Sequence, residues 1–181
     1  MTEQMSVKIA ALPSLRLTVE AHGLMAKKAL GQNFLLDQNI TDKIINLSLQ
    51  KQNKKDFSGA NVFEVGPGPG GLTRAVLAAE PKSLTVVEMD ERCIAIMNEI
   101  KEKTGDILHI INGDAMQTDF SVLAPAPRHI ISNLPYNISV PLLVGWLKNI
   151  NAYDSLTLMF QKEVAERITA PIKTKDYGRI S

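Results

Sequence analysis

Five short apolar runs recur along the chain, and polar or glycine-rich segments separate them. Each run has the length of a strand that is buried on both faces, and the five cover residues 62–65, 84–87, 107–111, 129–132 and 156–160. Between the runs, apolar residues three or four positions apart predict helices over residues 72–79, 94–100 and 142–150, and a further helix around 40–47 precedes the first run. This alternation predicts an α/β fold with a parallel sheet and right-handed crossovers.

The residues that could bind a ligand or take part in a reaction follow the predicted strands. In a parallel α/β sheet, ligands bind beyond the carboxyl ends of the strands, and there the sequence places a glycine cluster, Glu88 and Asp114. Residues 1–25 have only a weak pattern. We therefore expect a peripheral N-terminal extension over 1–25 and a catalytic domain over 26–181.

Composition narrows the class of protein. The chain has 181 residues, 45% of them apolar and 22% charged, as expected for one globular domain. A net charge of +1 does not by itself indicate a nucleic-acid-binding protein, so any RNA contact must come from local clusters of Lys and Arg. Cys93 is the only cysteine and the three histidines are scattered, so we expect neither disulfides nor a metal site. The sequence has no signal peptide and no apolar stretch long enough for a membrane span, which predicts a cytoplasmic protein.

The glycine loop after the first run permits two interpretations. Gly66, Gly68 and Gly71 have the spacing of a dinucleotide-binding loop. Glu88 follows at the sequence separation expected for an acid that accepts hydrogen bonds from ribose hydroxyls. An NAD-type oxidoreductase is therefore one alternative. Pro67 and Pro69, however, each remove a backbone N–H donor that a pyrophosphate would need.

The second interpretation is a loop for S-adenosylmethionine, which carries no phosphate. This cofactor needs acceptors for its ribose and for its cationic groups, and Glu64, just before the loop, suits a cation. Asp114 considered alone is a common turn or helix-cap residue. Because it lies beside two other acids at strand ends, we expect it to accept the exocyclic amine of the cofactor's adenine.

The segment after the fourth run, Asn133, Leu134, Pro135 and Tyr136, is the candidate catalytic site. The reaction considered is methyl transfer to the exocyclic nitrogen of an adenine. This nitrogen is a poor nucleophile because its lone pair is delocalised into the ring. The Asn133 amide oxygen and the Leu134 carbonyl can accept its two N–H groups and direct the lone pair, while Tyr136 offers a face on which a flipped base can stack. The competing interpretation is a turn that merely begins a helix at Ser139 and Pro141, but the position after the fourth strand favours chemistry.

With these motifs in place, the chain resembles the KsgA-type ribosomal RNA small-subunit adenine dimethyltransferase family. The resemblance rests on KKALGQNFL (27–35), EVGPGPGG (64–71), VVEMD (86–90), GDAM (113–116), NLPYNIS (133–139), QKEVA (161–165) and YGR (177–179). It implies a Rossmann-like class I S-adenosylmethionine-dependent methyltransferase fold with sheet order 3-2-1-4-5. It also implies that relatives continue beyond Ser181 with two more strands and a helical domain.

The resemblance further implies the site and the substrate. The cofactor contacts would be Asn33, Leu35, Gly66, Glu88, Asp114 and Asn133. The substrate would be two adjacent adenosines in the 3′-terminal hairpin of small-subunit rRNA, each dimethylated during ribosome biogenesis.

Lys27 and Lys28 form a solvated pair expected to meet RNA phosphates.

Erythromycin-resistance methylases share the catalytic pattern, as do mitochondrial transcription-factor B proteins, so a noncatalytic ribosome-assembly or transcription factor of the same fold is another alternative.

Overall fold

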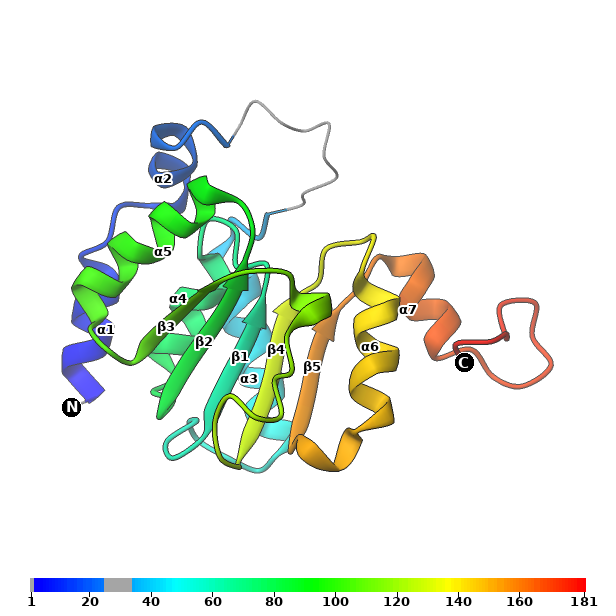
Figure 1. The fold of residues 1–181 in the computed structure, drawn as a ribbon. Helices are drawn as coiled ribbons and strands as arrows, with labels where there is room; N and C mark the ends of the chain where they lie inside the picture. The colour runs from blue at the N-terminus through cyan, green and yellow to red at the C-terminus, as the bar shows by residue number, and fades with distance from the viewer. Residues whose placement is uncertain (1, 25–33) are drawn as a thin grey trace.

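The computed structural model describes residues 2–24 and 34–181, and a five-stranded parallel sheet forms its centre (Figure 1). The strands are β1 (Asn61–Val65), β2 (Ser83–Glu88), β3 (Leu108–Asn112), β4 (Arg128–Asn133) and β5 (Ser155–Met159), in the order β3-β2-β1-β4-β5. All five predicted strands are confirmed, with ends that differ by at most one residue, and the sheet order is the one that the resemblance implied.

Helices cover both faces of the sheet. One face carries α3 (Gln38–Lys51), α4 (Gly71–Ala78) and α5 (Glu91–Thr104), and the other carries α6 (Ser139–Lys148). The short helices η2 (Ala115–Gln117) and η3 (Ile150–Ala152) and the last helix, α7 (Lys162–Ile168), complete the elements after β3. The predicted helix over 142–150 is wrong at its end, because Asn149 leaves the helical conformation (φ −126°, ψ 42°) and Ile150 begins η3.

Alternating side chains along the strands build two separate cores. On β1, Val62 packs with α3, α4 and α5, while Phe63 and Val65 pack with α6 and the loop before β4. In the second core the Phe120 ring meets Phe63 and Trp146 edge to face, at centroid distances of 5.7 and 5.9 Å. Burial on both faces explains why these strands appear in the sequence as continuous apolar runs.

Two N-terminal helices, α1 (Thr2–Ala10) and α2 (Leu15–Ala21), lie against α4 and α5. The buried Arg74 guanidinium on α4 donates to the Pro13 carbonyl at 2.6 Å and to the Thr18 hydroxyl at 3.3 Å, and so ties α2 to the sheet layer. Leu15 and Val19 are buried. The weakly patterned segment thus contributes to the core, while the boundary expected at residue 26 stays a prediction.

Strands β1 and β4 separate toward their carboxyl ends. Their register pairs only three residues, from Asn61 with Arg128 to Phe63 with Ile130. Beyond this point the buried Ser132 hydroxyl bridges the strands: it donates to the Val65 carbonyl at 2.7 Å and accepts from the Val65 N–H at 3.3 Å. Sheet order reverses between these two strands, which is where ligands of open α/β sheets bind.

No helix within residues 2–24 and 34–181 is long and apolar enough to cross a membrane.

Candidate active site

The glycine loop between β1 and α4 has few backbone donors to offer a ligand. Gly66 donates its N–H to the Val87 carbonyl at 2.9 Å, Gly70 donates to the Pro67 carbonyl at 3.0 Å, and Gly68 donates to a Glu88 carboxylate oxygen at 3.4 Å. The two prolines of the loop have no N–H. From Gly66 to Gly70, every N–H therefore already has an acceptor within the protein.

The segment Phe34–Leu35 lies directly on this loop. A Cβ on Gly68 would come within 2.9 Å of the Phe34 ring, and a Cβ on Gly71 would collide with the Leu35 carbonyl oxygen. These two residues line a hollow of about 20 Å³, together with Glu64, Asn133 and residues of the loop. The hollow has room for about one water molecule, so a larger group of a ligand can enter it only if residues that line it move apart.

Replacing Gly71 should test this close approach. Gly71→Ala is expected to lower the free energy of unfolding by about 1 to 3 kcal/mol, because the new methyl group must push the Leu35 carbonyl away. Gly145→Ala on α6 is the matched control: a Cβ there meets nothing within 4 Å, and removing a helical glycine should stabilise the protein by about 0.5 to 1 kcal/mol. Urea unfolding of both variants measures the difference, and equal stabilities would contradict the contact.

Glu64 lies deep in the sheet, on the face that α4 covers. Its side chain is only 2% exposed, and the Thr73 hydroxyl in the first turns of α4 donates to one carboxyl oxygen at 2.7 Å. Burial raises the pKa of Glu64 to about 8, the Thr73 hydrogen bond opposes this rise, and the negative charge of Glu88 adds to it. Glu64 lines the same hollow as Phe34, as expected for an acid close to the cofactor.

Glu88 ends β2 and connects the glycine loop to the following turn. One carboxylate oxygen accepts the N–H groups of Met89 and Asp90 at 2.8 and 3.0 Å, and the other accepts the Gly68 N–H at 3.4 Å. The carboxylate is thus held in place at the edge of the sheet, with its second oxygen only weakly engaged. This arrangement suits a group that receives hydroxyl donors from a ligand.

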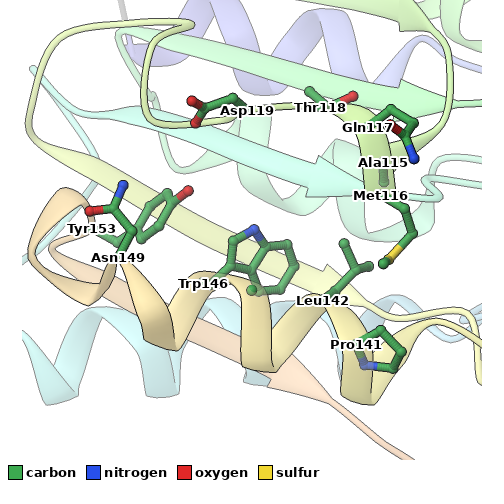
Figure 2. Close-up of a pocket in the computed structure, with 11 residues that line it drawn as sticks. Ala115, Met116, Gln117, Thr118, Asp119, Pro141, Leu142, Trp146, Asn149 and Tyr153 are labelled. Atoms are coloured by element: carbon green, nitrogen blue, oxygen red, sulfur yellow. The ribbon is translucent and has the colours of Figure 1, made fainter.

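Asp114 has the cap role that the sequence also allowed. It precedes η2, and one carboxylate oxygen accepts the Met116 N–H at 2.8 Å. Beside it, a groove of about 330 Å³ runs between η2 and α6 (Figure 2). Ala115, Met116, Pro141 and Leu142 line one end of the groove, Asn149 and Tyr153 line the other end, and Trp146 lies between them. A cavity of this size with apolar walls can hold a heterocyclic ring.

The predicted catalytic tetrapeptide packs against the glycine loop. Asn133 is the last residue of β4 and borders the hollow beside Glu64 and Gly66, and a Cβ on Gly66 would come within 3.2 Å of the Pro135 ring. Leu134 is buried, and its N–H donates to the Met159 carbonyl at 3.4 Å. The half-buried Tyr136 follows at the turn before α6, where its carbonyl accepts the Ser139 hydroxyl at 3.1 Å.

Most of the predicted site residues therefore gather at the carboxyl edge of the sheet. Leu35, Gly66 and Asn133 line one hollow, Glu88 holds the glycine loop, and Asp114 directly precedes Ala115, which lines the groove. Asn33, Lys27 and Lys28 lie outside the described residues, so their expected roles remain predictions. Among the side chains that the structure describes, no three of His, Cys, Asp or Glu are placed to hold a metal ion.

Three contributors to the site escaped the sequence analysis. Thr73, nine residues after Glu64, was treated only as part of a helix, although a hydroxyl in the first turns after a glycine loop could have indicated a partner for the acid. Ser132 was treated as the end of a strand, although a polar residue in a fully buried run calls for a partner. The groove side chain Trp146 belongs to the apolar face of the predicted helix over 142–150, but no local pattern indicates that it and Tyr153 face η2 across a groove.

Comparison with known proteins shows the family of this chain. The profile of the family described as "Ribosomal RNA adenine dimethylase" matches residues 23–181. "Ribosomal RNA small subunit methyltransferase A" of Gluconobacter oxydans is 50% identical over 171 residues, which cover 94% of this chain and 54% of that protein. The chain thus spans about half the length of this curated relative.

Solved structures show the same fold. A dimethyladenosine transferase from Plasmodium falciparum aligns with a TM-score of 0.67 and 32% identity, over 80% of this chain and 49% of that one. The 23S rRNA methyltransferase ErmE aligns with a TM-score of 0.60 and 26% identity, over 82% and 54% of the two chains. From the profile match and the identity to its relatives, the chain belongs to the ribosomal RNA adenine dimethylase family.

Proposed function

We propose that this chain contains the cofactor-binding and catalytic part of an S-adenosylmethionine-dependent rRNA (adenine-N6,N6)-dimethyltransferase. Its substrate would be two adjacent adenosines in the 3′-terminal hairpin of small-subunit rRNA, its partner the small ribosomal subunit precursor, and its compartment the cytoplasm. Family membership supports the reaction, and the small-subunit name of the Gluconobacter oxydans relative supports this substrate over large-subunit rRNA.

The engaged N–H groups of the glycine loop are the observation that carries the choice of cofactor. A pyrophosphate needs several backbone donors at the start of the helix, but Gly66, Gly68 and Gly70 already donate within the protein. Three acids instead provide acceptors: Glu64 near the end of β1, Glu88 at the end of β2 and Asp114 just after β3. S-adenosylmethionine offers cationic groups, ribose hydroxyls and an adenine amine to such acceptors, so the site fits this cofactor and disfavours NAD.

Each acid has a distinct task in this arrangement. Glu64 faces the cationic methionyl part beside the glycine loop, Glu88 accepts the ribose hydroxyls, and the Asp114 carboxylate accepts the adenine amine. The adenine ring would occupy the end of the groove beside Met116 and Leu142. When bound, the cofactor supplies an electrophilic methyl group at the hollow that Asn133 borders.

The tetrapeptide prepares the target amine. The Asn133 amide oxygen and the Leu134 carbonyl accept its N–H groups and turn the nitrogen lone pair toward the methyl group. Tyr136 stacks on the flipped adenine, a contact worth about 1 to 3 kcal/mol. Directly after transfer the methylated nitrogen is positively charged and strongly acidic, and it loses one proton to these acceptors or to water, so positioning and electrostatics provide the catalysis.

A binding experiment separates the two cofactor classes. Calorimetric titration should show saturable binding of S-adenosylmethionine and S-adenosylhomocysteine and none of NAD. Glu88→Ala should weaken cofactor binding by about 1 to 3 kcal/mol, because ribose hydroxyls would lose their acceptor.

Two further variants control for indirect effects in this experiment. Glu88→Gln keeps an acceptor oxygen and should lose less affinity than Glu88→Ala, and Glu102→Ala removes an exposed acid of α5 and should lose none. Saturable NAD binding, or wild-type affinity in Glu88→Ala, would contradict the proposal.

A further inference from the structure

Glu64 is a buried acid, and its neighbours offer few groups that could stabilise a negative charge. Its side chain is 2% exposed, and the Thr73 hydroxyl, at 2.7 Å, donates to one of its oxygens. Glu64 is also one of the residues that line the hollow, together with Leu35 and Asn133. It is therefore shielded from bulk water yet adjacent to the space that a ligand would fill.

The elements packed around Glu64 supply no positive charge among the described residues. On β2 the charged neighbour is Glu88, whose charge is of the same sign. On α4 the guanidinium of Arg74 turns away and donates to Pro13 and Thr18. On β4, Ser132 is bonded to the backbone of Val65, and Asn133 is uncharged.

A buried carboxylate without a cation is costly, because burial removes its hydration and one hydroxyl hydrogen bond cannot replace it. The cheaper state keeps the proton on the carboxyl. The raised pKa of Glu64, about 8, agrees with this argument from burial and neighbours. A cation placed in the hollow would instead favour the ionised carboxylate.

We propose that the Glu64 carboxyl is neutral in the ligand-free protein and releases one proton to solvent when the cationic methionyl part of the cofactor enters the hollow beside it. The inference rests on the proposed function, since it takes S-adenosylmethionine as the ligand. The proton leaves the carboxyl O–H for a buffer base, and the carboxylate that remains pairs with the ligand's positive charge. Cofactor affinity is thereby linked to pH through one buried side chain.

Linkage fixes how the affinity responds to pH. Below the pKa of the free carboxyl, binding must remove a proton, so the dissociation constant should fall about tenfold for each pH unit between pH 6 and 7.5. Glu64→Gln keeps an amide oxygen for the Thr73 hydroxyl but has no proton to release. The dissociation constant of this variant should stay nearly constant over this range. The wild type should therefore exceed the variant in cofactor affinity by the largest factor at the higher pH.

Proton counting by calorimetry tests the inference directly. At pH 7, S-adenosylmethionine is titrated into the wild-type chain in phosphate and in Tris, whose ionisation heats differ. The difference in binding heat should correspond to about one proton released by the wild type and none by Glu64→Gln. Should the variant fold poorly, the carboxyl stretching band of wild-type Glu64 in infrared difference spectra should still change from COOH to COO⁻ on binding.

A titration with S-adenosylhomocysteine, the product that the cofactor becomes after methyl transfer, identifies which positive charge acts on Glu64. S-adenosylhomocysteine keeps the α-ammonium group but lacks the sulfonium charge, so proton release with both ligands assigns the effect to the ammonium, and release with the methyl donor alone assigns it to the sulfonium. Saturable binding with no proton released would overturn the inference and leave the proposed function standing. No binding of either ligand would overturn both.

Discussion

Asn133→Ala is expected to lower the rate of methyl transfer by about 100- to 1,000-fold at saturating S-adenosylmethionine. Removing one preorganised hydrogen-bonding group from a catalytic site has this order of effect. Asn133 ends β4 and lines the same hollow as Gly66 and Glu64, where the methyl group would be presented. An interaction made mainly as the amine becomes tetrahedral should appear in turnover rather than in RNA affinity.

Single-turnover transfer of tritiated methyl groups to undermethylated small ribosomal subunits, measured in the complete protein, tests this expectation. Asn133→Asp is the matched control, because a carboxylate of nearly the same shape keeps an acceptor oxygen and should retain more activity than the alanine variant. Because Asn133 also borders the cofactor hollow, affinity for S-adenosylmethionine is measured in parallel. Near-normal transfer by Asn133→Ala at saturation would remove this residue from the catalytic role.

The sheet could be predicted from the sequence because its strands are buried on both faces. Val62, Leu84 and Ile130 belong to continuous apolar runs, and such runs need no knowledge of their partners to be recognised. The N-terminal helices could not be predicted in this way. Leu15 and Val19 are buried through contacts with segments far along the chain, where Arg74 binds the carbonyl of Pro13 and the hydroxyl of Thr18.

The candidate site was predictable to the extent that a residue's place in the fold decides its role. Glu88 and Asp114 end neighbouring parallel strands, so their shared edge follows from the order of elements. Their hydrogen bonds do not follow from it. The Asp114 carboxylate caps η2 through one oxygen, so the cap interpretation and the binding interpretation, which the sequence presents as alternatives, are compatible in one side chain.

The protonation state of Glu64 was beyond sequence reasoning, which treated it as an ordinary acceptor for a cation. Its neutral form results from the α4 helix and the Phe34 segment that close over β1, and from the absence of a cation on the described elements around it. These contacts join residues nine to thirty positions away from it in the sequence. A local motif therefore gives the position of the acid but not its charge.

The buried carboxyl also predicts how the ligand-free protein responds to pH. The folded state holds the Glu64 proton with a pKa of about 8, whereas the unfolded chain has the ordinary value of 4.5. Since the folded pKa is the higher one, the stability contributed by this group is fully present below pH 4.5 and is lost as the pH rises through 8. The loss should amount to at most about 5 kcal/mol over that interval.

Urea unfolding between pH 5 and 8.5, compared for the wild type and Glu64→Gln, isolates this contribution, because the amide cannot ionise. Buried His129 changes stability in the opposite sense: its lowered pKa makes the protein less stable as pH falls below about 6.5, but both proteins contain it and the effect cancels in their difference. The stability of the wild type relative to the variant should therefore decrease steadily toward pH 8. A difference that is independent of pH would mean that Glu64 is already ionised in the folded protein, and the same result would remove the proton that cofactor binding is proposed to release.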